Sequence, residues 1–226
     1  MKLTYYGHSC FLVELGGKKI LFDPFITPNE LAKEININTI EADFILISHG
    51  HVDHTADCIA IANRTRAQVV CNWEISEWLN KQGVQNTHAM NIGGKWNFDF
   101  GTVRCINAVH SSSLPDGTYG GNPMGFLLTS PGKSFYYSGD TALTMDMQLI
   151  NRWTQIDFAI LPIGDNFTMD YADAIEAAHM LNATSVLGVH YDTFPPIKIN
   201  HHQVKQSFAT EGITLHLPKI GESIDF

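Results

Sequence analysis

The chain places four potential metal ligands within six positions, in the stretch His49-Gly50-His51-Val52-Asp53-His54. This stretch directly follows the apolar run Phe44-Ile45-Leu46-Ile47, which is typical of a buried parallel strand. Open α/β proteins carry their chemistry beyond the carboxyl ends of such strands. Because alternate residues of an extended segment point the same way, the first two histidines can bind one ion. The aspartate and the third histidine follow a turn and can face a second ion. The alternative is a polar loop, but histidines clustered at ligand spacing rarely serve packing.

Three further apolar segments each end in a histidine or an aspartate. Residues 103–109 lead into His110, residues 134–139 into Asp140, and residues 185–189 into His190. Any one of these residues alone would be interpreted as structural. Their shared position after a strand predicts that they meet the first stretch at one rim, as a site built on rigid elements should.

In this ligand order the sequence resembles the metallo-β-lactamase superfamily, along essentially its whole length. The order is HxHxDH, a single histidine, an aspartate within Ser-Gly-Asp-Thr, and a final histidine. Asp23, in Leu21-Phe22-Asp23-Pro24, is similar to that superfamily's N-terminal motif. Four more stretches resemble a small bacterial group of uncharacterised metal-dependent hydrolases related to the ascorbate-6-phosphate lactonases. These stretches are Tyr6–Phe11, Gly121–Phe126, Gly164–Met169 and His190–Pro195.

The resemblance implies an α/β fold, a four-layer αβ/βα sandwich in which two mixed sheets lie between helices. We expect residues 1–226 to form one hydrolase domain, because no linker, charge block or low-complexity tract divides them. The fold would consist of two related halves, and we place the seam between them near residue 130.

Apolar periodicity and turn residues predict the individual elements. Strands are expected at 3–6, 10–15, 18–22, 69–71, 95–98, 103–109, 125–129, 134–138 and 156–163. Helices are expected at 54–64, 73–81, 171–181 and 201–210, where Asn200 precedes the last helix.

The resemblance also implies which residues bind metal. The set is His49, His51 and His110 for one ion, Asp53, His54 and His190 for a second, and Asp140 as a bridge. Zinc suits five imidazoles best, and the two carboxylates would tolerate manganese or iron. Two ions sharing one water can lower its pKa toward neutrality, and the resulting hydroxide attacks a carbonyl carbon or a phosphorus. We expect Asp53 to be catalytic by orienting that hydroxide.

Two residues outside this set allow two interpretations each. Asp23 either accepts the free N–H of a ligand imidazole or forms an Asx turn before Pro24. His8 either lines the cavity or makes a structural hydrogen bond. The remaining histidines, His88, His179, His201, His202 and His216, do not follow strand ends, and core or surface positions are expected for them.

The polar, Gly-rich segment 111–123 leaves His110 and is expected to border the cavity. Its hydroxyls and backbone N–H groups would then hold a polar or phosphorylated substrate; the alternative is an ordinary surface connection. We name Ser111 and Asn122 from this segment as substrate contacts, with His8 and Thr193 on the opposite wall.

Composition restricts the partners. The formal charge is −9 and the 14 Lys and Arg residues form no basic cluster, which disfavours nucleic acid. We expect no membrane association, since no apolar run approaches the length of a span and no secretory signal is visible. Four separated cysteines within apolar segments indicate buried free thiols and hence a cytoplasmic location.

These features favour a small-molecule hydrolase that acts on an ester, a lactone or a phosphorylated metabolite. A phosphodiesterase or nuclease is the alternative, and a catalytically silent metal-binding protein is less favoured because the ligand set is complete. Asp140 stands where the true β-lactamases of the superfamily have cysteine. His51 stands where its diiron flavoproteins have glutamate. Lactamase activity and oxygen reduction are therefore not expected.

Overall fold

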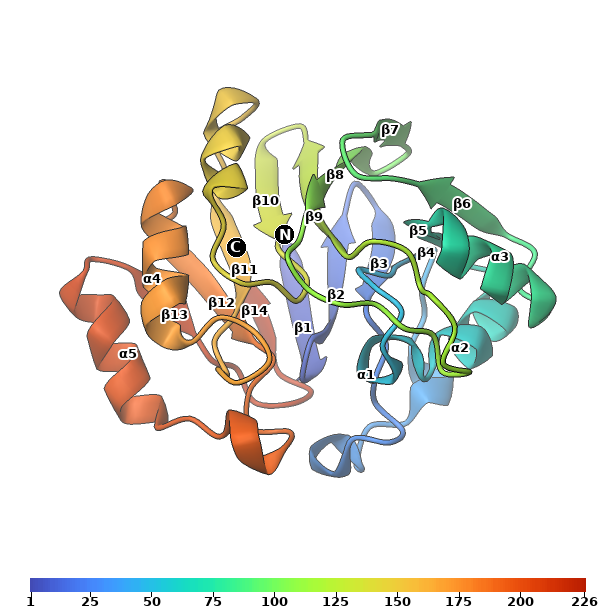
Figure 1. Cartoon of the computed structure of the whole chain (residues 1–226), viewed down its shortest axis with the longest axis horizontal. Coiled ribbons are helices and arrows are strands. Elements are labelled where there is room, and N and C mark those ends of the chain that lie inside the picture. The colour runs from blue at the N-terminus through green and yellow to red at the C-terminus, as the bar shows by residue number, and fades with distance from the viewer.

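Two seven-stranded mixed sheets face each other in the computed structural model, which describes residues 1–226 (Figure 1). The first sheet has the strand order β14-β1-β2-β3-β4-β5-β6 and the second β13-β12-β11-β10-β9-β8-β7. The first-sheet strands are β1 Lys2–Gly7, β2 Cys10–Leu15, β3 Lys18–Phe22, β4 Phe44–Leu46, β5 Gln68–Asn72, β6 Thr87–Met90 and β14 Ser223–Asp225. The second-sheet strands are β7 Lys95–Phe98, β8 Gly101–Asn107, β9 Met124–Ser130, β10 Lys133–Tyr137, β11 Phe158–Pro162, β12 Ser185–Val189 and β13 Thr214–His216.

Helices cover the outer faces of both sheets, which confirms the predicted four-layer sandwich (Figure 1). The α-helices are α1 Val52–Thr55, α2 Cys58–Thr65, α3 Trp73–Lys81, α4 Tyr171–Met180 and α5 His201–Thr210. Short 3-10 helices occur at η1 Glu30–Ala32, η2 Ile37–Thr39, η3 Met145–Arg152 and η4 Pro195–Ile197. None of the helices is long and apolar enough to cross a membrane.

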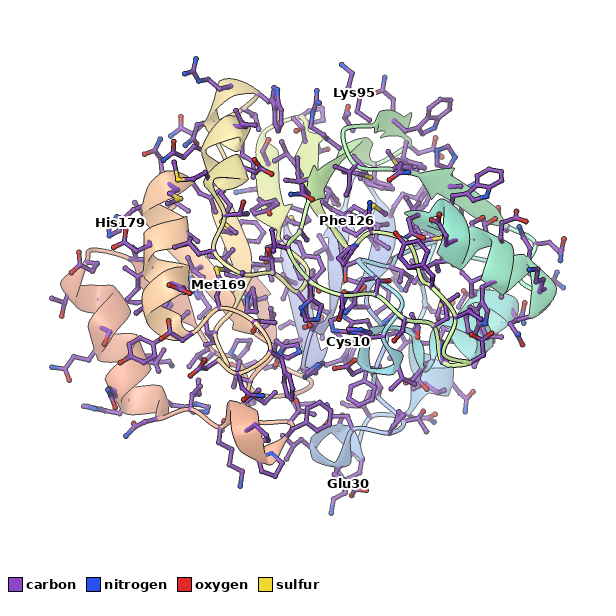
Figure 2. The ribbon with its side chains drawn as sticks, in the orientation of Figure 1. Cys10, Glu30, Lys95, Phe126, Met169 and His179 are labelled. Carbon is purple, nitrogen blue, oxygen red and sulfur yellow. The ribbon has the colours of Figure 1, made fainter.

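The core follows the two-residue period of the strands. Ile20 and Phe22 of β3 belong to a 45-residue cluster that fills the space between the sheets and extends under α4 and α5. Leu21, which points to the opposite face, belongs to a 19-residue cluster under α2 and α3. In Figure 2, Phe126 lies in the interior, whereas Lys95 extends into solvent.

The strand directions place many carboxyl ends at one edge of the sandwich. In the first sheet, β1 and β3 are each antiparallel to β2, and β4 is parallel to β3. In the second sheet, β8 and β10 are each antiparallel to β9, while β11 and β12 continue parallel to β10. The residues that follow β1, β3, β4, β8, β10 and β12 therefore meet at this edge.

Two predictions about the fold are wrong. The helix expected at 54–64 is two helices, α1 and α2, because Asp57 interrupts it. The Asp57 carboxylate accepts the backbone N–H groups of Ile26 (2.6 Å) and Thr27 (2.8 Å), which anchors this point to the segment after β3.

The seam between the halves is also not near residue 130, which lies in the β9–β10 hairpin of the second sheet. The chain passes from one sheet to the other between Met90 and Lys95, and β14 returns to pair with β1.

The helices expected at 73–81, 171–181 and 201–210 are confirmed. Strands β6, β13 and β14 are additions to the predicted set.

Candidate metal centre

Six strand ends bring the predicted ligands, His8 and Asp23 together. His8 follows β1, Asp23 follows β3, and the HxHxDH stretch follows β4. His110, Asp140 and His190 follow β8, β10 and β12. The backbone is held in the left-handed region at His8 (φ 55°), Asp23 (φ 41°) and His190 (φ 55°). Such conformations cost about 1–3 kcal/mol each in non-glycine residues and cluster at functional sites.

The first ligand group consists of His49, His51 and His110, whose ligand atoms all lie within 4.8 Å of one another. His49 Nε2 is 2.9 Å from His51 Nδ1, and the other nitrogen of His49 is 3.0 Å from the Ser48 hydroxyl. His51 and His110 are partly open to solvent, whereas His49 is buried. Three imidazole nitrogens converging on one point suit a zinc ion.

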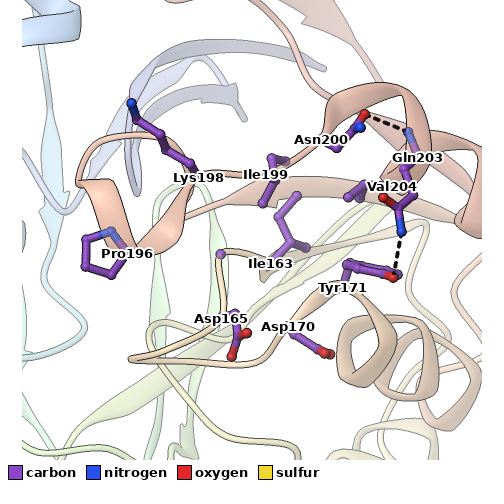
Figure 3. Close-up of a pocket in the computed structure, with 11 residues that line it drawn as sticks. Ile163, Asp165, Asp170, Tyr171, Pro196, Lys198, Ile199, Asn200, Gln203 and Val204 are labelled. Carbon is purple, nitrogen blue, oxygen red and sulfur yellow. Dashed lines mark hydrogen bonds between the residues drawn. The ribbon is translucent and has the colours of Figure 1, made fainter.

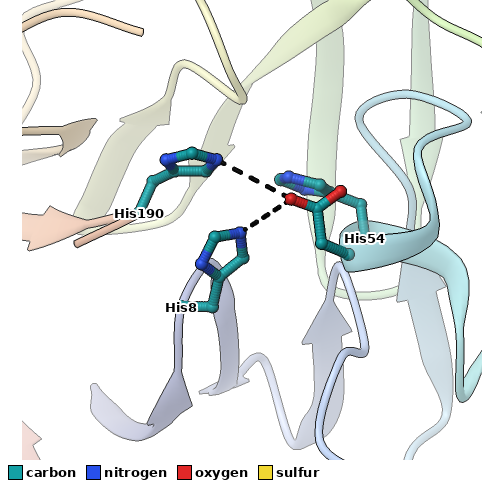
Figure 4. Close-up of side chains that lie close together, drawn as sticks. His8, His54 and His190 are labelled. Carbon is teal, nitrogen blue, oxygen red and sulfur yellow. Dashed lines mark hydrogen bonds and ion pairs between the residues drawn. The ribbon is translucent and has the colours of Figure 1, made fainter. Parts of the chain in front are cut away.

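The second ligand group consists of Asp53, His54 and His190, and His8 lies beside it (Figure 4). Asp53 Oδ2 is 3.1 Å from His8 Nε2 and 3.9 Å from His190 Nε2. His8, His54 and His190 are all buried, and the backbone N–H of His190 donates to the His8 carbonyl (3.0 Å). This group is therefore enclosed by the protein to a greater extent than the first.

Asp140 lies between the two groups. Its Oδ2 atom is 3.9 Å from His49 Nε2 and 3.6 Å from His110 Nε2, which belong to the first group. The same atom is 3.3 Å from His54 Nε2 and 3.0 Å from His190 Nε2, which belong to the second. One carboxylate thus faces members of both groups.

Asp23 supports the second group through a hydrogen bond to His54. Its Oδ2 atom accepts the Nδ1–H of His54 (2.8 Å) and the hydroxyl of Tyr137 (2.6 Å). Ser48 donates its backbone N–H to Oδ1 (2.8 Å) and its hydroxyl to Oδ2 (2.6 Å). Of the two interpretations of Asp23, the geometry matches the one in which it fixes the ring of a ligand imidazole. Tyr137 was missed by sequence reasoning, because it is one apolar position within a strand.

His8 connects Asp53 to Thr193. Burial and the neighbouring His190 ring lower the pKa of His8 to about 4, so the ring is neutral. Asp53 Oδ2 can only accept, and His8 therefore donates its Nε2–H to it. The other nitrogen then accepts the hydroxyl of Thr193, which lies 2.9 Å from His8 Nδ1. The side chain forms a directed link from the segment after β12 to the carboxylate of Asp53.

Electrostatics show that the cluster fits a cation. Burial lowers the pKa of His49 well below its usual value, and burial likewise lowers that of His51 and His110, which keeps their lone pairs available. Burial also disfavours the charge of His54, but Asp140 and Asp23 outweigh it and raise the pKa of His54 well above normal. The carboxylates thus favour positive charge at His54.

The hydrogen-bond pattern agrees with this fit. His54 Nε2 and Asp140 Oδ1 are buried and have no hydrogen-bond partner in the protein. A divalent ion is the group that would satisfy both atoms, and its binding would displace protons.

A cavity of about 690 Å³ lies above the ligands. It is lined by Phe25, Pro28, His51, Val52, Asp53, His110, Ser111, Asp140, Phe167, His190, Phe194 and Pro196. Of the expected substrate contacts, only Ser111 is in this lining. Thr193 lies behind it against His8, and Asn122 is exposed, with its side chain accepting the Tyr119 hydroxyl (2.8 Å).

Segment 111–123 packs against the metal-binding loop more than it faces the cavity. The Ser112 hydroxyl accepts the backbone N–H of Gly50 (3.0 Å), and a Cβ on Gly120 would lie 2.5 Å from that hydroxyl. The carbonyl of Gly120 also accepts the Asn72 amide (2.7 Å). These contacts fix the backbone between His49 and His51.

The cavity walls are aromatic, which sequence reasoning missed. Phe25, Phe167 and Phe194 each follow a strand end by a few residues, on β3, β11 and β12. In the sequence, Phe25 and Phe194 lie close to Asp23 and His190, and Phe167 lies in the Gly164–Met169 stretch, and these positions were the signal that could have identified them.

The histidines expected to lie outside the site do so. His88, His179 and His216 lie in β6, α4 and β13, and His201 pairs with Asp192 (2.6 Å) at the start of α5. A separate cavity of about 180 Å³ lies near the start of α5 and contains no histidine; Tyr171 and Lys198 are among the residues that line it (Figure 3).

Comparisons with known proteins agree with this geometry. The family model described as the Beta-lactamase superfamily domain matches residues 18–191. A UPF0173 metal-dependent hydrolase of Flavobacterium johnsoniae is 52% identical over 225 residues, and one of Methylacidiphilum infernorum is 51% identical over 224 residues. The alignments cover 100% of both chains in the first case and 99% of both in the second. A solved metallo hydrolase of the archaeon Ignicoccus hospitalis is 36% identical, with a TM-score of 0.89 over 100% of this chain and 98% of that one.

The chain belongs to the metallo-β-lactamase superfamily and is a metal-dependent hydrolase of that fold. Within the superfamily it groups with the UPF0173 metal-dependent hydrolases, with which it shares about half of its residues along the whole length. The family predicted from the ligand order is therefore confirmed.

Proposed function

We propose that the protein is a two-metal hydrolase of small molecules, with zinc as the preferred ion. The observation that carries this proposal is the position of Asp140, whose Oδ2 atom lies 3.0–3.9 Å from ligand nitrogens of both groups. Seven ligand side chains exceed the needs of one tetrahedral ion. His49, His51 and His110 would hold one ion, and Asp53, His54 and His190 the other.

Two ions bound there would supply an activated water and positive charge for the oxyanion that develops. The protein's own residues provide the rest. Asp53 is partly exposed to the cavity, and His8 fixes one of its oxygens, so the other is available to orient the attacking water. Asp23 holds the ring of His54, which prevents its rotation away from the centre.

The reaction we propose is hydrolysis of an ester, a thioester or a lactone. The oxygen of water bonds to the carbonyl carbon, the bond to the leaving oxygen or sulfur breaks, and a proton from water passes to the leaving group. Ser111 lines the cavity and its hydroxyl lies 3.3 Å from His51 Nε2, but the other nitrogen of that ring faces His49 and no carboxylate, so an acid to complete a nucleophilic triad is missing. The cavity volume of about 690 Å³ and the net charge of −9 support a small substrate over nucleic acid. The four buried thiols support a reducing cytoplasm.

Metal analysis and a substrate screen test this proposal. Protein purified without chelator should contain close to two equivalents of metal per chain. It should hydrolyse lactones or thioesters faster than bis-p-nitrophenyl phosphate. One equivalent of metal that is unchanged by Asp140→Ala would exclude the two-ion centre. Faster cleavage of the phosphodiester would show a phosphodiesterase instead.

A further inference from the structure

The cavity above the ligands has an apolar wall of its own. Phe25, Phe167 and Phe194 line it together with Val52 and two prolines, Pro28 and Pro196. Phe25 and Phe194 have ring centroids 6.3 Å apart. Both rings also pack against the imidazole of His8 in T-shaped contacts, with centroid distances of 5.4 Å and 5.5 Å. The wall is therefore continuous with the second ligand group.

Two apolar side chains of this wall remain exposed. Phe167 is 51% exposed and Val52 is 55% exposed, and both line the cavity. A half-exposed phenyl side chain lacks part of the free energy that its complete burial would provide. An apolar group of a bound ligand would cover both side chains.

Cationic side chains are absent from this cavity. None of its lining residues is lysine or arginine, and its charged members are the carboxylates Asp53 and Asp140. Away from the metal ions that we propose, recognition of a phosphate usually requires arginine, lysine or a helix N-terminus directed at the anion. Lys198 lines the separate smaller cavity and not this one (Figure 3).

We infer that the substrate carries an uncharged apolar group of about the size of a phenyl ring or a short alkyl chain. This group packs on Phe25, Phe167 and Phe194 while the scissile carbonyl faces Asp53 and Asp140. The inference rests on the proposed hydrolase function and specifies its substrate class. It replaces the expectation of a polar or phosphorylated substrate held by segment 111–123. A cavity of about 690 Å³ is within the usual range of roughly 300–1,000 Å³ for small-molecule sites.

Matched acyl esters test the inference. Zinc-loaded protein is assayed with three p-nitrophenyl esters, whose acyl groups are acetyl, 4-phenylbutanoyl and 4-phosphonobutanoyl. The 4-phenylbutanoyl ester should have a kcat/KM at least about tenfold above the acetyl ester, and the phosphono ester should be the poorest. Phe167→Ala should reduce the preference for phenylbutanoyl over acetyl about tenfold, and Phe167→Leu should restore most of it.

Trp96→Ala is the matched control, because Trp96 is also an exposed aromatic residue (54%) but lies on β7, outside the cavity. It should leave the preference unchanged. Binding of the uncharged 4-phenylbutanamide, measured by isothermal titration calorimetry, gives a readout that does not depend on turnover. Phe167→Ala should weaken this binding as well.

The outcomes separate the inference from the function on which it rests. Ester hydrolysis with no preference for the phenyl chain, or with the phosphono ester preferred, would overturn the inference and leave the hydrolase intact. Equal effects of Phe167→Ala and Trp96→Ala would also overturn it. If no ester is hydrolysed but the amide binds and Phe167→Ala weakens it, the apolar site stands and the proposed reaction fails.

Discussion

The first and second ligand groups share Asp140 but are held in different ways. In the first group, His51 and His110 are partly exposed, and the outward nitrogen of His51 has only the exposed Ser111 hydroxyl as a partner (3.3 Å). In the second group, His54 is fixed by the buried Asp23, and Asp53 is fixed by His8. Both groups line the cavity, but two side chains of the second group, His54 and Asp53, are held by buried partners, whereas two side chains of the first are partly exposed. We therefore expect the second group to maintain its geometry without metal better than the first.

Replacement of Asp140, which faces both groups, should have the largest effect on activity. Asp140→Ala should lower kcat/KM by at least about 10²–10³-fold, because it removes the one carboxylate that faces both groups. Metal content should fall from two equivalents to one or fewer. Steady-state kinetics and elemental analysis of the same preparations measure both. Full metal content in the variant would show that the groups bind their ions independently of Asp140.

Removing one ligand from each group should also abolish most activity. His51→Ala and His190→Ala are each expected to reduce kcat/KM about 10²-fold or more, since each removes a metal ligand at the reacting centre. Thermal unfolding without metal should distinguish them, because the side chain of His190 is buried and that of His51 is partly exposed, so His190→Ala should lower the unfolding temperature more. His201→Ala is the control, as His201 is exposed at the start of α5. Equal losses in all three variants would contradict the assignment.

Asp23→Asn tests the support of the second group. The amide offers one acceptor to His54, Ser48 and Tyr137 where the carboxylate offered two. Affinity for the ion of the second group should fall about 10–100-fold, and affinity for the first should fall less, because Asp23 contacts His54 directly but reaches His49 only through Ser48. Competition with a chromophoric chelator resolves the two affinities. A uniform loss for both ions would show that Asp23 supports the whole fold of this edge and not one group.

The smallest effects come from two matched hydroxyls. Thr193→Val removes the partner of buried His8, whereas Ser111→Ala removes the partner of half-exposed His51. The first should lower kcat several-fold, up to about tenfold, because Asp53 loses part of its orientation. The second should stay within about twofold, as most exposed substitutions do. If Ser111→Ala proves the more harmful, Ser111 contacts the substrate, as the sequence alone suggested.

Much of the site was predictable because all seven proposed ligands follow the ends of only four strands. Apolar periodicity locates β4, β8, β10 and β12, and the residues after them form both ligand groups. The ligand order then identified the family. The single helix expected at 54–64 was wrong because its interruption depends on a contact that is distant in the sequence. The carboxylate of Asp57 accepts backbone N–H groups from the segment after β3.

What the sequence determined by itself is therefore the set of candidate ligands and, through the resemblance that their order carries, the superfamily and its layer architecture. Two-residue alternation and the residue at a strand end are local properties, so local pattern is sufficient to place the strands and the candidate ligands that follow them. Only the tertiary structure decided the link from Thr193 through His8 to Asp53, the four donors around Asp23 and the phenylalanine wall of the cavity. These contacts join segments separated by up to 185 positions, and they depend on strand register and packing across two sheets.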